Sequence, residues 1–350
     1  MTSLSASLQL QAPIVQAPMA GAQGAALAAA VCEAGALGSV PAAMHTPDSL
    51  DAELQALRAL TQRPFNLNFF CHRPPTPDAA ALARWHAALA PHYQALGLDP
   101  AQMPSGAGRA PFGPEHLPLI ERHRPAVLSF HFGLPEAALL ARARALGCQI
   151  WSSATTVAEA RWLQAHGADV IIAQGLEAGG HRGMFLSDDL STQLGTLALL
   201  PQVLAAVDRP VLAAGGVADA AGVRAMRALG ASGVQIGTAW LCTPEASTSA
   251  LHRAALRSSA AEHTALTRLF SGRPARGIVN GLMRAFDPMD PLAPAFPLAG
   301  AALGPLRSAA EAQGRTDYTP LWSGQNASAC QDLPAAELAA RFIAAWQAGA

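Results

Sequence analysis

Short apolar runs alternate with amphipathic stretches along most of this chain. Runs of this length predict buried strands, which we expect at 14–18, 37–40, 65–70, 126–130, 149–152, 169–173, 210–214 and 233–237. Between the runs, apolar residues recur at helical spacing, as Leu50, Leu54 and Leu57 do after Pro47. Helices are therefore expected at 25–34, from Pro47 onward, and at 78–96, 135–146, 156–166, 196–206, 219–229 and 333–348.

The regular alternation of strand and helix predicts the fold class. Strands separated by helices pair in parallel, because parallel neighbours need a crossover connection. Eight such units close naturally into a (β/α)8 TIM barrel, which is the α/β fold that we predict. The alternative is an open doubly wound sheet, which would carry a glycine fingerprint after its first strand. Gly21 and Gly24 are too sparse for that fingerprint.

Two segments interrupt the alternation. Residues 72–120 are rich in proline and glycine, and residues 243–327 combine helices with irregular, proline-rich stretches. Since the helix at 333–348 can serve as the last barrel helix, we expect residues 1–242 and 328–350 to form the barrel. Residues 243–327 would then be a mainly helical lid over the carboxyl ends of the strands, where such barrels carry their active site.

Composition narrows the class of protein. Hydrophobic residues make up 51% and charged residues 13%, with a net charge of −1. This balance predicts a large core, and it argues against a nucleic-acid or membrane partner. The basic residues are all arginine, which excludes a Schiff-base or P-loop lysine. The five cysteines form no CxxC pair, so we expect reduced thiols, a cytoplasmic location and no metal site.

One glycine-rich stretch stands out, Gln-Gly-Leu-Glu-Ala-Gly-Gly-His-Arg-Gly183, which follows the predicted strand 169–173. Glycines let a flat ligand approach the main chain, and a histidine can exchange a proton near neutral pH. The stretch could be an ordinary loop with a solvated histidine. Its position after a barrel strand favours His181 as a catalytic base beside a bound cofactor.

Two further glycine-rich turns follow the last two predicted strands, Ala-Ala-Gly-Gly-Val217 and Gln-Ile-Gly-Thr238. In these barrels the corresponding loops often bind phosphate, because small residues leave backbone N–H groups free for an anion. Simple tight turns are the alternative. Met19, Asn68 and His131 also follow predicted strands, so one site would collect all of these residues.

Together these motifs resemble the nitronate monooxygenase family, formerly called 2-nitropropane dioxygenases. The resemblance rests on Gln-Ala-Pro-Met-Ala-Gly21, Asn68, Gln-Gly-x-Glu-Ala-Gly-Gly-His181, the two glycine turns and Leu-Trp-Ser-Gly-Gln325. It runs from about residue 12 to the C-terminus. It implies FMN bound without a covalent link, and oxidation of an alkyl nitronate by O2 to a carbonyl compound and nitrite.

The resemblance also assigns roles. His181 would be the catalytic base, with His131 as a second polar wall. The flavin phosphate would lie at Gly215, Gly216, Gly237 and Thr238. The full set of implied cofactor contacts is Ala17, Pro18, Met19, Ala20, Asn68, Gln174, Gly179, Gly180, Ala214, Gly215, Gly216, Gln235, Ile236, Gly237 and Thr238.

Two alternatives remain open from the sequence. Flavin enoyl-acyl-carrier-protein reductases and NADH:quinone reductases carry related motifs, so an NAD(P)H-dependent reductase is one alternative. A barrel that binds a phosphorylated ligand without turnover is the other. The expected partners are a nitronate or nitroalkane and O2.

Some positions depart from the family pattern or carry no motif. Phe296, Gly300 and Gly304 stand where some members have two tyrosines and a lysine. Arg182 and Arg307 could replace the missing cation, but surface positions are expected for both. Four further histidines belong to no pattern and are predicted to lie on the surface: His45, His72, His116 and His123.

Overall fold

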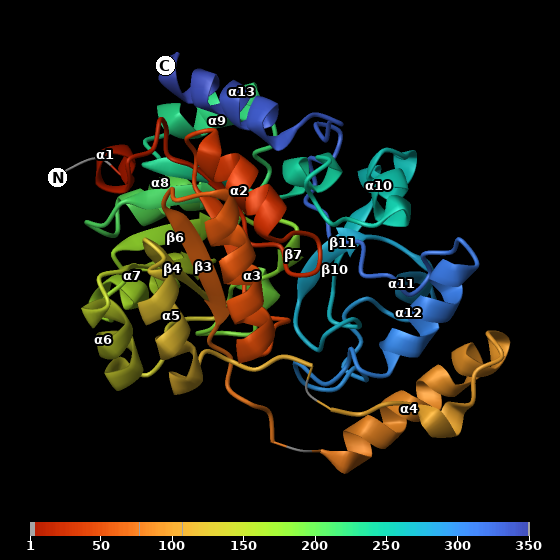
Figure 1. The fold of residues 1–350 in the computed structure, drawn as a ribbon. Helices are drawn as coiled ribbons and strands as arrows, with labels where there is room; N and C mark the ends of the chain where they lie inside the picture. The colour runs from red at the N-terminus through yellow and green to blue at the C-terminus, as the bar shows by residue number, and fades with distance from the viewer. Residues whose placement is uncertain (1–3, 77, 107, 349–350) are drawn as a thin grey trace.

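Parallel strands form a barrel with helices around it, and a second region lies beside this barrel (Figure 1). The computed structural model describes residues 4–76, 78–106 and 108–348. Over these ranges eight strands pair in the order β1-β9-β8-β6-β5-β4-β3-β2. Their bounds are β1 Ile14–Gln16, β2 Gly38–Pro41, β3 Phe65–Phe70, β4 Val127–His131, β5 Gln149–Ala154, β6 Val170–Gln174, β8 Val211–Ala214 and β9 Gly233–Ile236.

Backbone hydrogen bonds close the sheet between β1 and β2. The Leu37 N–H donates to the Ile14 carbonyl, and the Gln16 N–H donates to the Leu37 carbonyl, both at 2.9 Å. The predicted (β/α)8 fold is therefore confirmed.

Helices surround the barrel on its outer side. In the described part of the chain one of them follows each barrel strand: α2 Ala25–Glu33, α3 Pro47–Leu60, α5 Leu117–His123, α6 Ala137–Ala145, α7 Val157–Ala165, α8 Thr196–Leu204, α9 Ala220–Ala228 and α13 Ala335–Gln347. The C-terminal α13 packs against both α9 and α2, as Figure 1 shows. It therefore takes the eighth helix position that the sequence predicted.

Side-chain caps set the start of several of these helices. The Thr46 hydroxyl accepts from the Ser49 N–H before α3, and Asp219 accepts from the Gly222 N–H before α9. Such caps satisfy N–H groups that the first helical turn leaves without a partner. Pro47 suits the first helical position because its missing N–H would be unpaired there.

The period of two along the strands separates an inner and an outer core. Val170 and Ile172 of β6 lie in the barrel interior, whereas Ile171 and Ala173 pack against the helices. Helix α1, Leu4–Leu8, adds Leu8 to the interior cluster. The interior is thus filled with side chains, which confines any ligand to the loops at the strand ends.

The interrupting segments build a second region beside the barrel (Figure 1). It contains α4 Ala79–Ala95, α10 Ala250–Leu256, α11 Gly281–Ala285 and α12 Leu303–Ala312. An antiparallel sheet with the order β10-β11-β7 joins it to the barrel, with β7 Gly180–His181, β10 Thr264–Thr267 and β11 Ala275–Ile278. Short 3-10 helices lie at Pro100–Gln102, Pro114–His116, Leu190–Thr192, Thr238–Cys242 and Ser259–Glu262.

Helix α4 belongs to this second region, although it is distant from residues 243–327 in sequence. Its Trp85 indole N–H donates to the Ala299 carbonyl at 3.2 Å, and its Tyr93 hydroxyl donates to the Ala302 carbonyl at 2.6 Å. Both aromatic side chains are buried in one cluster with residues of α11 and α12. The two interruptions of the alternation therefore pack together.

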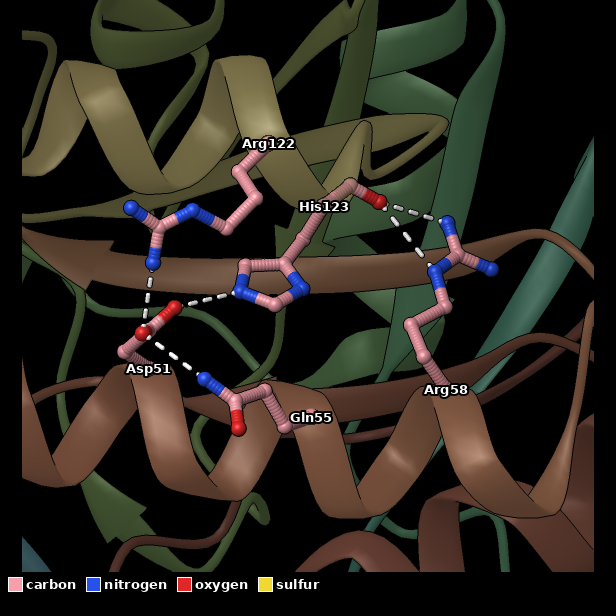
Figure 2. Close-up of polar contacts among 5 residues, drawn as sticks. All are labelled: Asp51, Gln55, Arg58, Arg122 and His123. Carbon is pink, nitrogen blue, oxygen red and sulfur yellow. Dashed lines mark hydrogen bonds and ion pairs between the residues drawn. The ribbon is translucent and has the colours of Figure 1, made fainter.

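A polar cluster fastens α5 to α3 (Figure 2). The Asp51 carboxylate accepts from Arg122 and from His123 Nε2, each at 2.6 Å, and from Gln55 at 2.9 Å. Arg58 Nη2 donates to the His123 carbonyl at 2.7 Å. The sequence did not predict α5, because its few apolar residues define no clear helical period.

Three of the four histidines that were predicted to lie on the surface are buried, so that prediction was wrong for them. His72, His116 and His123 are 5%, 6% and 7% exposed. His116 stacks on Phe112, and the His72 ring meets Phe296 edge-on. Phe296, and the Asp51 carboxylate at His123, come from other parts of the chain, so single positions in the sequence do not reveal that the imidazoles are buried. His45 is partly exposed.

No helix within the described ranges is both long and apolar enough to span a membrane.

Candidate functional site

A cavity of about 430 Å³ lies at the carboxyl ends of the barrel strands. Barrel loops form one side, and residues of the second region, among them Arg109, His252 and Trp322, form the other. His131 and His181 both line it. The lining also includes nearly all of the expected cofactor contacts: Ala17, Pro18, Met19, Ala20, Asn68, Gln174, Gly179, Gly180, Ala214, Gly215, Gly216, Gln235, Gly237 and Thr238.

Ile236 is the exception among the expected contacts. Its side chain is 1% exposed and packs with Val234 in the core between the strands and the helices. Successive residues of a strand point to opposite faces, so Gln235 lines the cavity and Ile236 cannot. The side chain of Ile236 therefore does not belong to the candidate site.

The two glycine turns after β8 and β9 offer free backbone donors to the cavity. Among the described residues, the N–H groups of Gly215, Gly216, Gly237 and Thr238 donate to no carbonyl or side chain. Gly215 and Gly216 have φ values of +113° and +72°, a region that favours glycine. All four residues are half-buried and line the cavity, and a cluster of backbone N–H groups of this kind can bind an anion.

The segment after β11 closes this part of the cavity. The Gly324 N–H donates to the Thr238 hydroxyl at 2.9 Å, and the Asn326 amide donates to the Gly216 carbonyl at 3.0 Å. At Gly179, an added Cβ would lie 2.5 Å from the Gly324 nitrogen. Glycine is required at Gly179 because the two backbones approach closely there. The late Trp-x-Gly-Gln element of the sequence thus takes part in the same site.

Amide side chains add further polar groups. The Gln235 Oε1 is buried, and it has no partner in the described part of the chain. Gln174 instead uses its whole amide on the loop that follows it: Nε2 donates to the His181 carbonyl at 3.0 Å, and Oε1 accepts from the Gly183 N–H at 2.7 Å. Asn68 donates to the Ser129 hydroxyl at 2.9 Å. The Gln235 Oε1 is therefore open to a ligand.

His181 lies on β7, at the junction of the barrel and the second region. It pairs with Ala275 of β11, and its Nε2 lies 2.9 Å from the Ser271 hydroxyl. Burial, reinforced by the nearby charge of Arg109, holds the pKa of His181 well below its usual 6.5. Its imidazole is consequently neutral near pH 7 and able to accept a proton.

Aromatic rings surround His181 and make its side of the cavity apolar. Their centroids lie between 5.5 and 6.0 Å from the imidazole centroid, and the rings belong to Phe70, Phe132, Phe296 and Trp322. Of these rings, Phe70 and Trp322 line the cavity itself.

His131 is held on both of its ring nitrogens. Nε2 lies 3.1 Å from the His181 carbonyl, and Nδ1 lies 3.0 Å from the Ser153 hydroxyl. A carbonyl only accepts, so Nε2 carries the proton and Nδ1 accepts from Ser153. Burial lowers the pKa of His131 to about 4, which keeps this arrangement neutral.

The prediction of a surface position was wrong for Arg182 and correct for Arg307. Arg182 is 0% exposed, and it donates to the carbonyls of Gln174 and Gly175 at 2.8 and 2.6 Å. It also donates to the Gln193 side chain. Arg182 therefore holds the backbone of the glycine-rich stretch by hydrogen bonds. Arg307, in contrast, is exposed and lines the cavity.

Sequence reasoning missed several residues of the site. Arg109 lies in the proline-rich interruption, His252 in α10, and Ser271 in the loop between β10 and β11. None of them follows a barrel strand, which was the signal used to find the others. These residues reach the site because the second region packs against the barrel loops, and this long-range packing has no local signal in the sequence.

Comparisons with known proteins agree on one family. A family model described as nitronate monooxygenase matches residues 1–344. A nitronate monooxygenase of Paraburkholderia phytofirmans is 42% identical over 337 residues, which are 96% of this chain and 92% of that protein. A nitronate monooxygenase of Pseudomonas aeruginosa is 42% identical over 333 residues, covering 95% of both chains.

Solved structures give the same picture. The nitroalkane oxidase of Streptomyces ansochromogenes is similar with a TM-score of 0.87 and 38% identity, covering 99% of this chain and 98% of that one. FabK from Thermotoga maritima shares the fold, with a TM-score of 0.71 at 22% identity over 99% of this chain and 97% of that one.

Proposed function

The chain belongs to the nitronate monooxygenase family of oxidoreductases, and we propose that it is an FMN-dependent enzyme that oxidises alkyl nitronates. O2 is the oxidant, and the products are a carbonyl compound and nitrite. The observation that carries the proposal is a set of four N–H groups, unpaired among the described residues, on the same cavity as His181, whose pKa is lowered by burial.

The glycine turns would hold the phosphate of FMN. Gly215, Gly216, Gly237 and Thr238 present donors without a protein partner in the described structure, and an anion bound there would satisfy them. A dinucleotide would need room for a second phosphate and an adenosine, for which the sequence has no Rossmann fingerprint. We therefore propose FMN and not FAD.

The other expected contacts would hold the ring and the ribityl chain. Gln235 Oε1, buried without a partner among the described residues, would accept from a ring N–H or a ribityl hydroxyl. Met19, Ala20 and Asn68 line the neighbouring wall. Bound FMN would supply the electron transfer between substrate and O2; the residues described next supply binding, orientation and proton transfer.

His181 would remove the α-proton when a neutral nitroalkane enters. Its depressed pKa leaves the imidazole unprotonated, and its Nδ1 makes no hydrogen bond among the described residues. A nitronate has already lost this proton, so its oxidation does not need the base. We assign His131 a positioning role, because both of its nitrogens are engaged.

Residues 243–327 would act as a lid. Thr248, His252 and Trp322 line the cavity opposite the barrel loops, and the Gly324 and Asn326 bonds fix this segment to the two glycine turns. A lid in this position would keep solvent away from the reacting groups.

Identification of the released chromophore tests the cofactor, and product analysis tests the reaction. Heat-denatured protein should release FMN, identified by mass spectrometry, and the native protein should form nitrite from a pre-formed alkyl nitronate with consumption of O2. Release of FAD would refute the cofactor assignment. Rapid flavin bleaching by NADH without O2, together with no nitrite formation, would replace the proposal with a reductase.

A further inference from the structure

Arg109 is a half-buried arginine of the cavity wall whose guanidinium has no acceptor in the described part of the chain. It lies between α4 and α5 and lines the same cavity as His181. Within the described ranges its guanidinium makes no hydrogen bond and no ion pair; its recorded contact is with the ring of Phe296, 5.8 Å from the centroid. Burial lowers its pKa, although an arginine stays charged in proteins.

Three other arginines of the described structure donate to oxygen acceptors of the protein. Arg182 donates to two carbonyls and to Gln193, Arg273 donates to the Met184 carbonyl at 2.7 Å, and Arg276 donates to the Leu176 carbonyl at 2.9 Å. Each of these cations has oxygen acceptors from the protein. Taking a cation out of water is costly unless it is paired, so an anion that fills the cavity would give Arg109 the acceptor that the described chain does not provide.

The cavity offers Arg109 no competing carboxylate. Glu311 is the acidic residue among the lining residues in the described structure, and it accepts from the Thr319 hydroxyl at 2.8 Å. Arg109 and His181 line the same cavity, and the charge of Arg109 adds to burial in lowering the pKa of that imidazole. The free cation and the free base therefore face the same space.

We propose that Arg109 is the anion-recognition residue of the active site and binds the two oxygens of the substrate's nitronate group. This inference rests on the proposed function and specifies its substrate class. A guanidinium matches a planar two-oxygen anion with paired N–H donors, and Phe296 supports it from one side. Phe70 and Trp322, which lie beside His181 and line the cavity, would contact the alkyl chain, so we assign alkyl nitronates as the substrate class.

The proposal predicts different effects on anionic and neutral substrates. Arg109→Gln should raise KM for a pre-formed alkyl nitronate by about 10- to 100-fold, since hydrogen bonds to a charged group are among the strong ones. It should change KM for the neutral nitroalkane much less, and kcat less than KM. Arg109→Lys keeps the charge but not the paired donors, so it should fall between the two.

Binding of nitrate tests the same contact without turnover. Nitrate is planar and carries the same O–N–O geometry, and its affinity for the purified protein can be measured by isothermal titration calorimetry at constant ionic strength. Arg109→Gln should weaken nitrate binding by about 10-fold or more. Arg161→Gln, which removes an exposed arginine from α7, is the matched control and should leave the affinity unchanged.

The outcomes separate this proposal from the proposed function. Nitrate binding that depends on Arg109 would support the anion site even if the protein formed no nitrite from nitronates, which would refute the function alone. Nitronate turnover with the same KM and nitrate affinity in Arg109→Gln as in the parent would overturn the role of Arg109 and leave the function intact. Circular dichroism and the flavin spectrum confirm that each variant is folded and loaded.

Discussion

His131 donates its Nε2 proton to the backbone carbonyl of His181 at 3.1 Å. The Gln174 amide donates to the same carbonyl at 3.0 Å. Two donors from the ends of β4 and β6 thus converge on one oxygen of β7, a strand that belongs to the other sheet. Through this carbonyl the rigid barrel sets the position of the His181 ring, which is how a positioning residue contributes to catalysis.

His131→Phe should lower kcat while leaving the cofactor in place. Phenylalanine keeps the aromatic shape but loses the bonds to His181 and Ser153, and small displacements of reacting groups lower rates steeply, by about 10-fold or more. The measurement is kcat per bound flavin. His166→Phe makes the same change at a histidine stacked on Trp162 outside the cavity, and its rate should match the parent. A His131→Phe rate equal to the parent's would exclude the positioning role.

The barrel was predictable because its signals are local. Each strand is a short apolar run, and β3 matches the predicted range 65–70. The helices follow from apolar spacing and caps such as Thr46. The rest could not be predicted in this way: β11 reads Ala-Arg-Gly-Ile, which has no alternation, and it becomes a strand only because β10 and β7 lie beside it.

The residues of the candidate site also fall into two groups, those that local sequence signals predict and those that long-range packing brings in. Residues that follow barrel strands, such as Gly216 and Thr238, were identified from their position in the repeat. Arg109 and Ser271 could not be, because long-range packing brings them to His181. Ile236 was included because it lies within a motif, although the period of two points its side chain away from the cavity.

Gly216→Asp should weaken flavin binding strongly. The substitution places a carboxylate where we locate the phosphate, and two like charges at close range repel. Part of any effect comes from the backbone, because φ is +72° at Gly216 and a side chain there costs about 1 kcal/mol. Gly97→Asp controls for this, since Gly97 has a φ of +71° with nothing near its added Cβ. The flavin-to-protein ratio after dialysis is the readout, and equal ratios for the two variants would place the phosphate elsewhere.

Asp51→Asn should destabilise the protein at neutral pH, and the difference should shrink in acid. The hydrogen bond from His123, and then the contacts of Arg122, lower the pKa of Asp51 below 3.8. A lowered folded-state pKa means that the carboxylate stabilises the fold above the unfolded value of 3.8, and this stabilisation is lost as pH falls through the folded value. Arg58, which binds the His123 carbonyl, keeps its charge throughout.

Urea unfolding of the parent and Asp51→Asn at pH 7 and near pH 3 measures this difference. Asp208→Asn removes an exposed carboxylate that makes no side-chain contact among the described residues, and it should change the midpoint little at either pH. A gap between the parent and Asp51→Asn that stays the same at both pH values would show that Asp51 acts by packing and not by charge.

The pH dependence of nitroalkane oxidation should reflect the depressed pKa of His181. A base with a lowered pKa remains unprotonated, and therefore active, to lower pH. The acid limb of kcat/KM for a neutral nitroalkane should consequently lie well below pH 6.5, the ordinary value for histidine. Arg109→Gln removes the largest charge that depresses this pKa, so in that variant the limb should move upward. A limb at or above pH 6.5 in the parent would contradict the buried, positively charged surroundings described for this imidazole.

His181→Asn tests the base itself, because nitroalkane and nitronate differ only in the proton that the base removes. Asparagine keeps a polar side chain of similar reach but cannot accept a proton near pH 7. A positioned base contributes about 10²- to 10⁴-fold to proton transfer, so the variant should lose most of its activity on a neutral nitroalkane. Its activity on the pre-formed nitronate should fall much less, since Arg109 and the aromatic wall still bind the anion. Rates with both substrates, normalised to bound flavin, give the comparison. If His181 only packs the loop, both activities should decline together with flavin content, and if it only binds substrate, both should decline equally at full occupancy.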